Sequence, residues 1–488
     1  MDSFDLVIFG ITGNLAQIKL IPVLYDMVEK DILPESVQIV GTARSPMTQE
    51  EFESYFHKVL HQDNRHHKHD VHEAVLKKLF SKLHYLPGNL DDPSFYRNIK
   101  DYLKKIHKGE GKQNLVFYLA TYPQLYQSIF DNLKKIGLSD QEKRWVRLII
   151  EKPIGLDLPS AKKLNKLLLK YFHENQIFRL DHYLGKETLQ NILTFRFGNG
   201  IFEPMMNKKY IDHIQVSALE DFGIGKRGGY YDSVGALKDV GQNHLLQMLT
   251  IPCMDPPKEF LHTEVVKERQ KIIKKLISYP KSLILGQYEG YQKEENVAPD
   301  SVTDTYFAFK TEINNTRFKG VPIYIRGGKS LKQTATEISI VFKNPTNRLF
   351  KNLDGGKAPN VLVYRIQPNE GIMLQILTKK PDHGTALNHS FMQYCYPQNF
   401  PQHTFPDAYE KLIVDAIRGD QTYFNNAAEV ESEWKYIDEF TAKLPEPCLY
   451  KPGSWGPKEA DELIEKDGRK WLEPSNQLCS FTTISSLK

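Results

Sequence analysis

The N-terminal segment contains a pattern that narrows the folds open to this chain. Asp5–Phe9 is a short, uninterrupted apolar run, Gly10–Ala16 is a glycine-containing turn, and Leu20–Met27 is helix-like. A continuous apolar run predicts a strand buried in a parallel sheet. A strand, a glycine turn and a helix in this order are typical of dinucleotide-binding domains, because glycine lets backbone N–H groups approach a pyrophosphate at the positive end of the helix. The spacing is GxxGxxA rather than GxGxxG, so the turn alone does not distinguish a coenzyme site from an ordinary strand-to-helix turn.

The next predicted strand indicates which coenzyme such a domain would hold. Val37–Ala43 has the composition of a second parallel strand, and Arg44 follows it directly. An NAD-binding domain usually has an acidic residue near this strand end to bind the ribose 2′-hydroxyl, whereas an arginine suits a 2′-phosphate. A solvated arginine at a strand end is the simpler alternative. Position and charge together favour NADP, with NAD as a weaker alternative.

Three more short apolar segments extend this pattern towards residue 180. Asn114–Ala120, Arg147–Ile150 and Ile177–Arg179 predict further parallel strands. Lys152 lies just beyond the second of them, at the carboxyl end, where doubly wound sheets bind their ligands. We therefore expect residues 1–180 to form a Rossmann domain of the doubly wound α/β class that binds NADP.

From about residue 190 the pattern changes to longer strands without intervening helices. Consecutive strands joined by short polar turns predict an antiparallel sheet, and the segments concerned are 210–218, 303–313, 321–326, 337–342, 361–367 and 371–378. Helices are expected at 235–249 and within 258–278, 407–418 and 432–444, and the tail after Pro445 looks irregular. We therefore expect residues 181–488 to form an α+β domain for substrate binding and oligomerisation, with a large, mostly antiparallel sheet. The exposed face of such a sheet favours pairing with further copies as a homodimer or homotetramer.

Size, charge and composition exclude several classes of protein. The 488 residues exceed what one core usually holds, and a net charge of +4 gives no nucleic-acid footprint. The N-terminus has no basic leader, and no apolar run is long enough to span a bilayer. The four cysteines are far apart and form no CxxC pair, which favours a reduced compartment and argues against a cysteine metal site. We expect a cytoplasmic protein with no nucleic-acid or membrane partner.

A histidine-rich segment lies within residues 50–110, which otherwise predict helices with a polar surface. A metal site is conceivable there. Apart from His66 and His69 the spacing offers no ordered ligand set, so a solvated face is the better interpretation and we assign the segment no function. The clustered histidines are His61, His66, His67, His69 and His72.

Arg179–Glu187 combines an acid, an imidazole, a phenol and a cation, in Asp181, His182, Tyr183 and Lys186. This mixture suits holding an anionic ligand while placing a carboxylate beside a base. A polar loop before a helix is the plainer alternative.

A candidate base occurs at His244. It lies five residues after Asp239 on the helix expected at 235–249, so the two side chains roughly share a side. Alone, a histidine followed by two leucines is more typical of a core edge than of a catalyst. The case for His244 depends on a carboxylate such as Asp181 reaching it, because such a pair fixes the tautomer and stabilises the imidazolium.

Several of these segments together resemble one family. The chain is similar to glucose-6-phosphate dehydrogenases over nearly its whole length, with the motifs in the same order and at similar spacings. The stretches RLDHYLGKE and QNHLLQ are the most specific of these motifs. The matching segments are Gly10–Leu20, Glu151–Gly155, Arg179–Glu187, Glu220–Gly223, Arg227–Tyr231 and Asp239–Leu249.

The resemblance implies an activity and a role for each matching residue. The activity is oxidation of β-D-glucose 6-phosphate at C1 to 6-phosphoglucono-δ-lactone, the first step of the oxidative pentose phosphate pathway, with hydride transfer to NADP. His244 would be the general base, and Asp181 would orient it. The implied substrate contacts are Lys19, Lys152, His182, Tyr183, Lys186, Glu220, Asp239, Lys329 and Gln367. The implied coenzyme contacts are Gly10, Thr12, Gly13, Leu15, Arg44, Tyr126 and Lys152, and no metal is implied.

The chain departs from the family pattern at several positions. Asn14 replaces an acid in the glycine turn but still suits the start of a helix. Thr334 stands where the family commonly has a second cation near the substrate phosphate, and Lys332 is the nearest replacement. Animal members hold a second, structural NADP with cations in this region. Ala335 and Ser339 stand in their place, which argues against that second site here.

Two other functions remain open at this point. A related dehydrogenase acting on an unphosphorylated sugar would explain Thr334. An inactive relative that binds coenzyme without turnover is the third interpretation, but it gives no physical reason for His244, Asp181, Lys186 and Lys19 to be present together.

Overall fold

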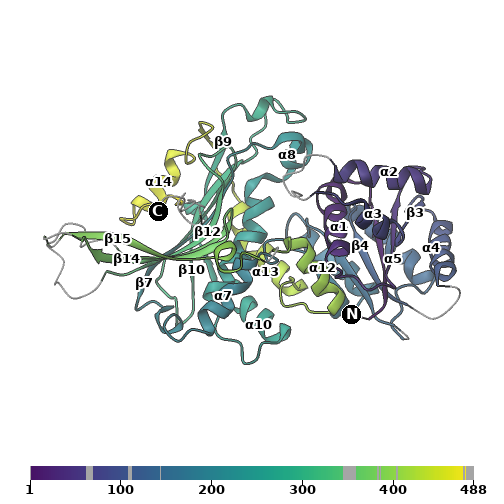
Figure 1. The fold of residues 1–488 in the computed structure, drawn as a ribbon. Coiled ribbons are helices and arrows are strands. Elements are labelled where there is room, and N and C mark those ends of the chain that lie inside the picture. The colour runs from purple at the N-terminus through teal and green to yellow at the C-terminus, as the bar shows by residue number, and fades with distance from the viewer. Residues whose placement is uncertain are drawn as a thin grey trace. The chain divides into compact units, whose positions relative to one another are not determined.

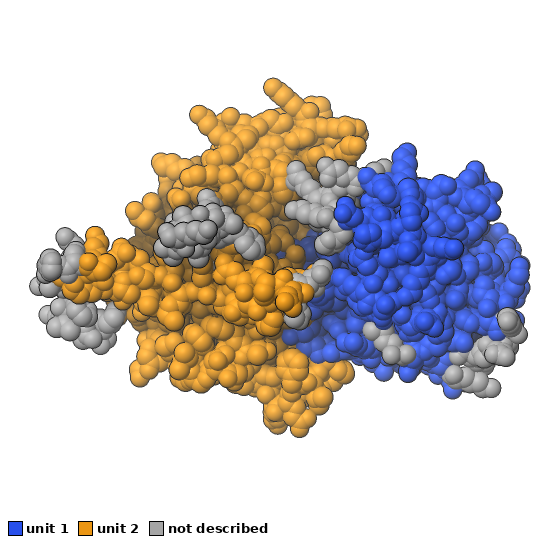
Figure 2. Space-filling view, viewed as in Figure 1, with its two compact units in different colours: residues 1–155, 159–185, 406–427 blue, residues 156–158, 186–405, 428–488 orange. Residues whose placement is uncertain are grey.

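The structure is a computed structural model that describes residues 2–61, 70–107, 113–142, 144–344, 359–381, 384, 386–402, 405–475 and 479. The chain divides into two compact units, shown in blue and orange in Figure 2. Unit 1 comprises residues 1–155, 159–185 and 406–427, and unit 2 comprises residues 156–158, 186–405 and 428–488. Among the helices that the structure describes, none is long and apolar enough to cross a bilayer.

Unit 1 is built on a six-stranded sheet whose strands are all parallel, in the order β3-β2-β1-β4-β5-β6. This is the doubly wound arrangement predicted for the N-terminal domain, and it is confirmed. Its strands are β1 (Phe4–Phe9), β2 (Gln38–Ala43), β3 (Leu83–Pro87), β4 (Asn114–Leu119), β5 (Val146–Ile150) and β6 (Ile177–Arg179). Its helices are η1 (Ala16–Leu20), α1 (Ile21–Glu29), α2 (Gln49–Leu60), α3 (Glu73–Phe80), α4 (Pro93–Ile106), η2 (Pro123–Leu125), α5 (Tyr126–Lys135), α6 (Leu158–Tyr171), η3 (Glu174–Gln176) and α12 (Ala408–Arg418).

The sheet of unit 1 is covered by helices on both faces (Figure 1). Side chains alternate along a strand, so Leu6 and Ile8 of β1 join one core while Val7 and Phe9 join the other. The first core includes side chains of α1, α2, α3 and α12, and the second includes side chains of α4, α5 and α6. Burial on both faces explains why the strands read as continuous apolar runs.

One strand of unit 1 was not predicted, and one of its helices was expected in the other domain. Residues 50–110 were expected to be helical, but β3 lies among them and extends the sheet beyond β2. Helix α12 was expected in the second domain, yet it packs in unit 1 through Tyr409, Leu412 and Ile413. The predicted boundary at residue 180 did not anticipate this return of residues 406–427.

Unit 2 is built on a large, mostly antiparallel sheet, as predicted, ordered β15-β14-β13-β12-β7-β11-β10-β9-β16 with β8 beside β10. Two pairs, β7 with β11 and β9 with β16, are parallel. The strands are β7 (Ile211–Leu219), β8 (Leu276–Ser278), β9 (Ile284–Tyr288), β10 (Tyr306–Ile313), β11 (Ile323–Gly328), β12 (Ala335–Phe342), β13 (Val361–Gln367), β14 (Gly371–Lys379), β15 (Leu387–Cys395) and β16 (Cys448–Tyr450). The helices are α7 (Glu187–Phe197), η4 (Glu203–Met205), η5 (Gly225–Arg227), α8 (Gly228–Ala236), η6 (Leu237–Leu245), α9 (Leu246–Cys253), α10 (His262–Ile273), η7 (Pro280–Ser282), η8 (Tyr291–Lys293), α11 (Tyr396–Asn399), α13 (Ala427–Thr441) and α14 (Lys458–Glu465).

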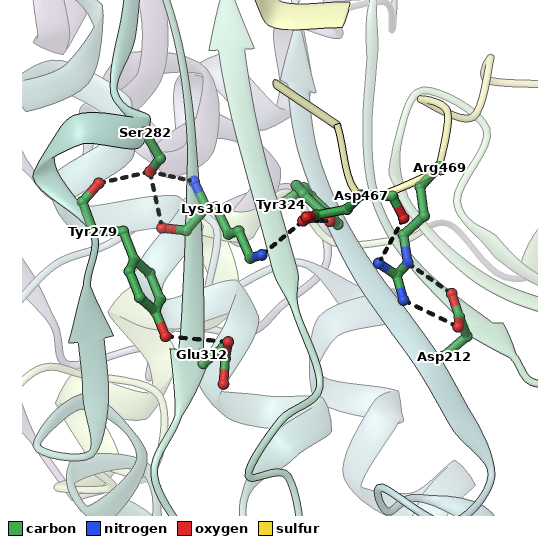
Figure 3. Close-up of polar contacts among 8 residues, drawn as sticks. All are labelled: Asp212, Tyr279, Ser282, Lys310, Glu312, Tyr324, Asp467 and Arg469. Carbon is green, nitrogen blue, oxygen red and sulfur yellow. Dashed lines mark hydrogen bonds and ion pairs between the residues drawn. The ribbon is translucent and has the colours of Figure 1, made fainter. Parts of the chain in front are cut away.

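The two faces of this sheet have different partners. On one face the ring of Phe309 in β10 packs against Phe440 of α13, with ring centroids 4.8 Å apart. On the other, Asp467 accepts a hydrogen bond from Lys310 (2.6 Å) and another from Tyr324 (2.5 Å) (Figure 3). Beside them, the guanidinium of Arg469 donates two hydrogen bonds, of 2.8 and 3.1 Å, to the carboxylate of Asp212 in β7 (Figure 3). The expectation of an irregular tail after Pro445 is therefore wrong, because β16, α14 and these polar contacts fix the segment onto the sheet.

The cysteines differ from the sequence-based expectation. Cys395, at the end of β15, and Cys479 form a disulfide across a sequence separation of 84 residues. Cys253 and Cys448 are free thiols. The expectation of reduced cysteines is wrong for this pair, because distance along the sequence says nothing about distance in the fold.

Candidate active site

The glycine turn after β1 folds tightly against the neighbouring strand β4. Gly10 has a φ of 92°, and a Cβ there would lie 2.5 Å from the carbonyl oxygen of Ala120. A larger residue would be both strained and obstructed. The backbone N–H of Gly13 donates to the carbonyl of Gly10 (3.0 Å), which closes the turn before η1 and α1 begin. The turn, including Thr12 and Leu15, thus places the positive end of a helix at the carboxyl end of β1, a position that fits a pyrophosphate.

Arg44 and Tyr126, two further predicted coenzyme contacts of unit 1, lie in contrasting positions. Arg44 is exposed directly after β2, the neighbour of β1, and therefore lies at the same edge of the sheet as the turn. Tyr126 begins α5 and is 1% exposed, with its ring packed near Phe130. Burial raises the pKa of the Tyr126 hydroxyl well above its usual range. This position gives no support to Tyr126 as a coenzyme contact, which stays a prediction.

Lys152 follows β5 at this same edge, and the residue before it is a buried acid. Glu151 accepts hydrogen bonds from the hydroxyls of Tyr118 and Tyr409. Burial raises the pKa of Glu151 to about 7, although the Tyr118 hydrogen bond and the charge of Lys152 act in the opposite direction. The peptide bond from Lys152 to Pro153 is cis.

The stretch Arg179–Glu187 begins with two buried charged residues. Arg179 is 1% exposed and its guanidinium contacts the carboxylate of Glu174 at 2.6 Å, which anchors the end of β6. Asp181 is buried, and its carboxylate accepts the backbone N–H of Tyr183 (3.0 Å). This side chain-to-backbone bond turns the chain sharply after the strand. Tyr183 is buried, whereas His182 is partly exposed.

Tyr409 joins several of the predicted site residues in unit 1, and the sequence analysis missed it. Its ring lies nearly parallel to that of His182, with centroids 6.1 Å apart, and the ammonium of Lys19 lies 5.6 Å from its centroid. Lys19 also pairs with Asp407 at 3.6 Å, and the Tyr409 hydroxyl bonds to Glu151. The apolar face of α12 could have indicated that Tyr409 packs against another element. The helix follows residue 180, however, and was therefore assigned to the second domain.

Three predicted substrate contacts of unit 2, together with Thr334, lie at one edge of its sheet. Glu220 and Lys329 directly follow the parallel strands β7 and β11, whose last residues are paired in register, and the two side chains form an ion pair. Gln367 ends β13 opposite Thr336 of β12. Thr334, just before β12, donates its hydroxyl to the carboxylate of Asp221 (2.6 Å). The sheet thus brings Glu220, Lys329 and Gln367 to the same edge.

Two lysines in unit 2 already have partners. Lys186, at the start of α7, lies 3.8 Å from the carboxylate of Glu370. Burial raises the pKa of Glu370, while the charge of Lys186 lowers it. Lys332, the suggested replacement for the missing cation, lies with its ammonium 5.1 Å from the ring centroid of Trp455.

His244 lies on η6, a nine-residue π-helix that continues into α9. The i to i+5 bonding of a π-helix brings residues five apart onto one side, so Asp239 and His244 share a side as predicted. Both are buried, with His244 only 1% exposed. Asp239 pairs with Arg227 at 3.3 Å. Short π-helical segments are frequent at functional sites, and η1, which carries Lys19, is another.

The predicted residues are therefore divided between the units. Unit 1 holds the coenzyme contacts together with Lys19, Lys152, Asp181, His182 and Tyr183, and unit 2 holds the remainder. The pairing of Asp181 with His244 stays a prediction. Most of the histidine-rich segment, including His66, His67 and His69, lies outside the described residues.

Two family models match this chain, and together they span most of its length. Residues 7–191 match the family "Glucose-6-phosphate dehydrogenase, NAD binding domain", and residues 193–472 match "Glucose-6-phosphate dehydrogenase, C-terminal domain". Residues 7–191 thus form a nicotinamide-dinucleotide-binding domain.

Full-length relatives and solved structures agree with these matches. The glucose-6-phosphate 1-dehydrogenase of Chlamydia pneumoniae is 40% identical over 96% of this chain and 95% of its own. That of Borreliella burgdorferi is 38% identical over 96% and 98%. A solved glucose-6-phosphate dehydrogenase in complex with its substrate glucose-6-phosphate is 32% identical, with a TM-score of 0.89 over 97% of this chain and 99% of the other. The Mycobacterium avium enzyme is also 32% identical, with a TM-score of 0.85 over the same shares. This chain belongs to the glucose-6-phosphate dehydrogenase family of oxidoreductases.

Proposed function

We propose that the protein oxidises β-D-glucose 6-phosphate at C1 to 6-phosphoglucono-δ-lactone with NADP, the opening reaction of the oxidative pentose phosphate pathway. The observation that carries this proposal is the match of both family domains, in order, across residues 7–191 and 193–472. Two features of unit 2 further support it: His244 is buried on the π-helix η6, and Glu220 pairs with Lys329 at one edge of the large sheet.

The chain's own residues supply proton transfer and binding. His244 takes the proton of the C1 hydroxyl, and Asp181 orients the imidazole and stabilises its charged form. Bound NADP supplies the hydride acceptor. His182, Tyr183 and Lys186 hold the 6-phosphate through charge-assisted hydrogen bonds. The remaining sugar contacts are Lys19, Lys152, Glu220, Asp239, Lys329 and Gln367.

The preference for NADP rests on Arg44. Its guanidinium is exposed at the end of β2, beside the glycine turn, where a 2′-phosphate would be held. The turn itself, Gly10 to Leu15, binds the pyrophosphate. Lys152 is proposed as a contact of both ligands, because it lies at the carboxyl end of β5 in the same sheet.

Three broader proposals accompany this function. We propose that residues 1–180 and 181–488 act as the coenzyme and substrate domains, with α12 supporting the former. Association as a homodimer or homotetramer is supported by β15, an edge strand that exposes Phe391 and Met392.

A cytoplasmic location stays a prediction, and disulfides are more usual in oxidising compartments. The thiol state of Cys395 and Cys479 in freshly lysed cells tests it.

A dehydrogenase of unphosphorylated sugars is the second candidate. Thr334 stands at the position of a phosphate-site cation, and its hydroxyl is engaged with Asp221. Reduction of NADP or NAD, followed at 340 nm with glucose 6-phosphate and with glucose, separates the two functions. We expect rapid reduction of NADP with the phosphorylated sugar and little with glucose. Equal kcat/KM for both sugars would overturn the proposal in favour of the second candidate.

A further inference from the structure

Helix α13 carries two buried glutamates one turn apart on the same side. Glu429 is 0% exposed and pairs with Arg269 of α10, whose guanidinium donates at 3.1 and 3.3 Å. Glu433 is 1% exposed. Burial of a carboxylate is costly unless it is paired or hydrogen-bonded, so the partners of each glutamate show what it does.

Glu433 binds two glutamine amides that flank His244 in sequence. Its Oε2 accepts from the Nε2 of Gln242 at 3.3 Å, and its Oε1 accepts from the Nε2 of Gln247. Both glutamines are buried. A carboxylate can only accept, so each amide must present its NH2 group to Glu433, which fixes the orientation of both side chains.

The two amides stand on either side of the transition from π-helix to α-helix. Gln242 lies in η6, and Gln247 lies in α9, five residues later. In a regular α-helix residues five apart point in different directions, whereas the wide turn of a π-helix lets them reach one acceptor. His244 is held in the segment between them.

We propose that Glu433 is a positioning residue for the reaction, which holds the π-helical turn through Gln242 and Gln247 and thereby keeps the imidazole of His244 in place. This inference rests on the proposed function, because it assumes that His244 is the base. Glu433 belongs to α13 and contacts the amides of Gln242 and Gln247, so it acts on His244 through them.

The expected cost of losing this contact follows from the geometry of proton transfer. A base works only within hydrogen-bond reach of the proton it accepts, and displacements of about 1 Å can cost roughly 100-fold in rate. Apart from Asp239, the proposed substrate contacts lie outside this helix, so substrate binding should change little. A positioning role therefore lowers kcat at nearly constant KM, whereas a purely structural role lowers the number of folded sites.

The test compares Glu433→Leu and Glu433→Gln with Glu429→Gln, a matched substitution one turn away on the same helix. Competent sites are counted by calorimetric titration with glucose 6-phosphate, and kcat is expressed per site. We expect Glu433→Leu to lower kcat per site by about 10- to 100-fold with KM within threefold. Glu433→Gln keeps an acceptor of nearly the same shape and should fold even where the leucine variant does not. It should cost about three- to tenfold, while Glu429→Gln lowers thermal stability but leaves kcat per site within twofold.

A chain that lacks both glutamine amides tests whether Glu433 acts through them. In a chain that already carries Gln242→Leu and Gln247→Leu, Glu433→Gln should lower kcat per site by less than twofold, because the contact it acts through is gone. The inference is overturned if Glu433→Gln leaves kcat per site unchanged, or if Glu429→Gln lowers it equally. His244→Asn is made in parallel. Normal turnover in that variant would instead contradict the proposed base, so the two failures are distinguishable.

Discussion

Replacing Glu151 by glutamine should make the protein less sensitive to alkaline pH. The carboxyl group is buried at the end of β5 and bonded to the hydroxyls of Tyr118 and Tyr409. Burial raises its pKa from an ordinary 4.5 to about 7. A glutamine amide can accept from one tyrosine and donate to the other, so both contacts have a counterpart in the variant.

The sign of the effect follows from proton linkage. Between pH 4.5 and 7 the folded protein keeps a proton on Glu151 that the unfolded chain releases. The free energy of unfolding therefore falls as pH rises through this window and levels off above it. The shift of about 2.5 pKa units corresponds to about 3 kcal/mol in total, of which about 2 kcal/mol separates pH 5 from pH 8.

Thermal unfolding at pH 5 and pH 8 measures this difference. For a unit of this size, about 2 kcal/mol corresponds to a change in Tm on the order of 5 °C. We expect the Tm of Glu151→Gln, relative to the native protein, to rise by that amount between pH 5 and pH 8. Glu35→Gln, at an exposed position in the same unit, is the control and should show no such trend. A Tm difference that is equal at both pH values would refute the reasoning about Glu151.

Two further variants test the ligand sites. Arg44→Ala should weaken NADP binding by about 10-fold or more while leaving NAD nearly unaffected, because it removes a charge-assisted contact to the 2′-phosphate; titration with both coenzymes measures this, and equal losses would contradict the assignment. Lys329→Gln breaks the ion pair with Glu220 at the edge of the large sheet and should raise KM for glucose 6-phosphate about 10-fold with Kd for NADP unchanged. An unchanged KM would remove Lys329 from the substrate site.

Strands and turns that are specified by neighbouring residues were predicted correctly from the sequence. A continuous apolar run followed by Gly10 specifies a buried strand and a tight turn, and the structure has both. The change to longer strands without intervening helices after residue 190 likewise predicted the large sheet. These signals lie within a few residues of one another, so no knowledge of the tertiary fold is needed to read them.

The features that depend on distant parts of the chain were missed. Strand β3 is an edge strand that alternates buried and partly buried side chains, so it lacks the apolar run of its neighbours. Helix α12 returns to unit 1 from more than two hundred residues away, and Tyr409 reaches His182 and Lys19 only through that return. The disulfide of Cys395 with Cys479 has the same origin.

The helix around His244 shows that the sequence pattern did not reveal the type of helix. Its existence was predicted, but the apolar pattern does not distinguish a π-helix from an α-helix. The widened turn matters because it sets which side chains share a face. Glu433, which holds that turn, has no signal in its own sequence neighbourhood.

The central claim is that His244 is the base that removes the C1 hydroxyl proton. The most direct measurement is the turnover of His244→Asn with glucose 6-phosphate and NADP at saturation, on protein whose Tm and NADP affinity match those of the native chain. A general base contributes about 100- to 10,000-fold, so we expect kcat to fall by at least 100-fold with little change in KM. Turnover close to the native value would contradict the account.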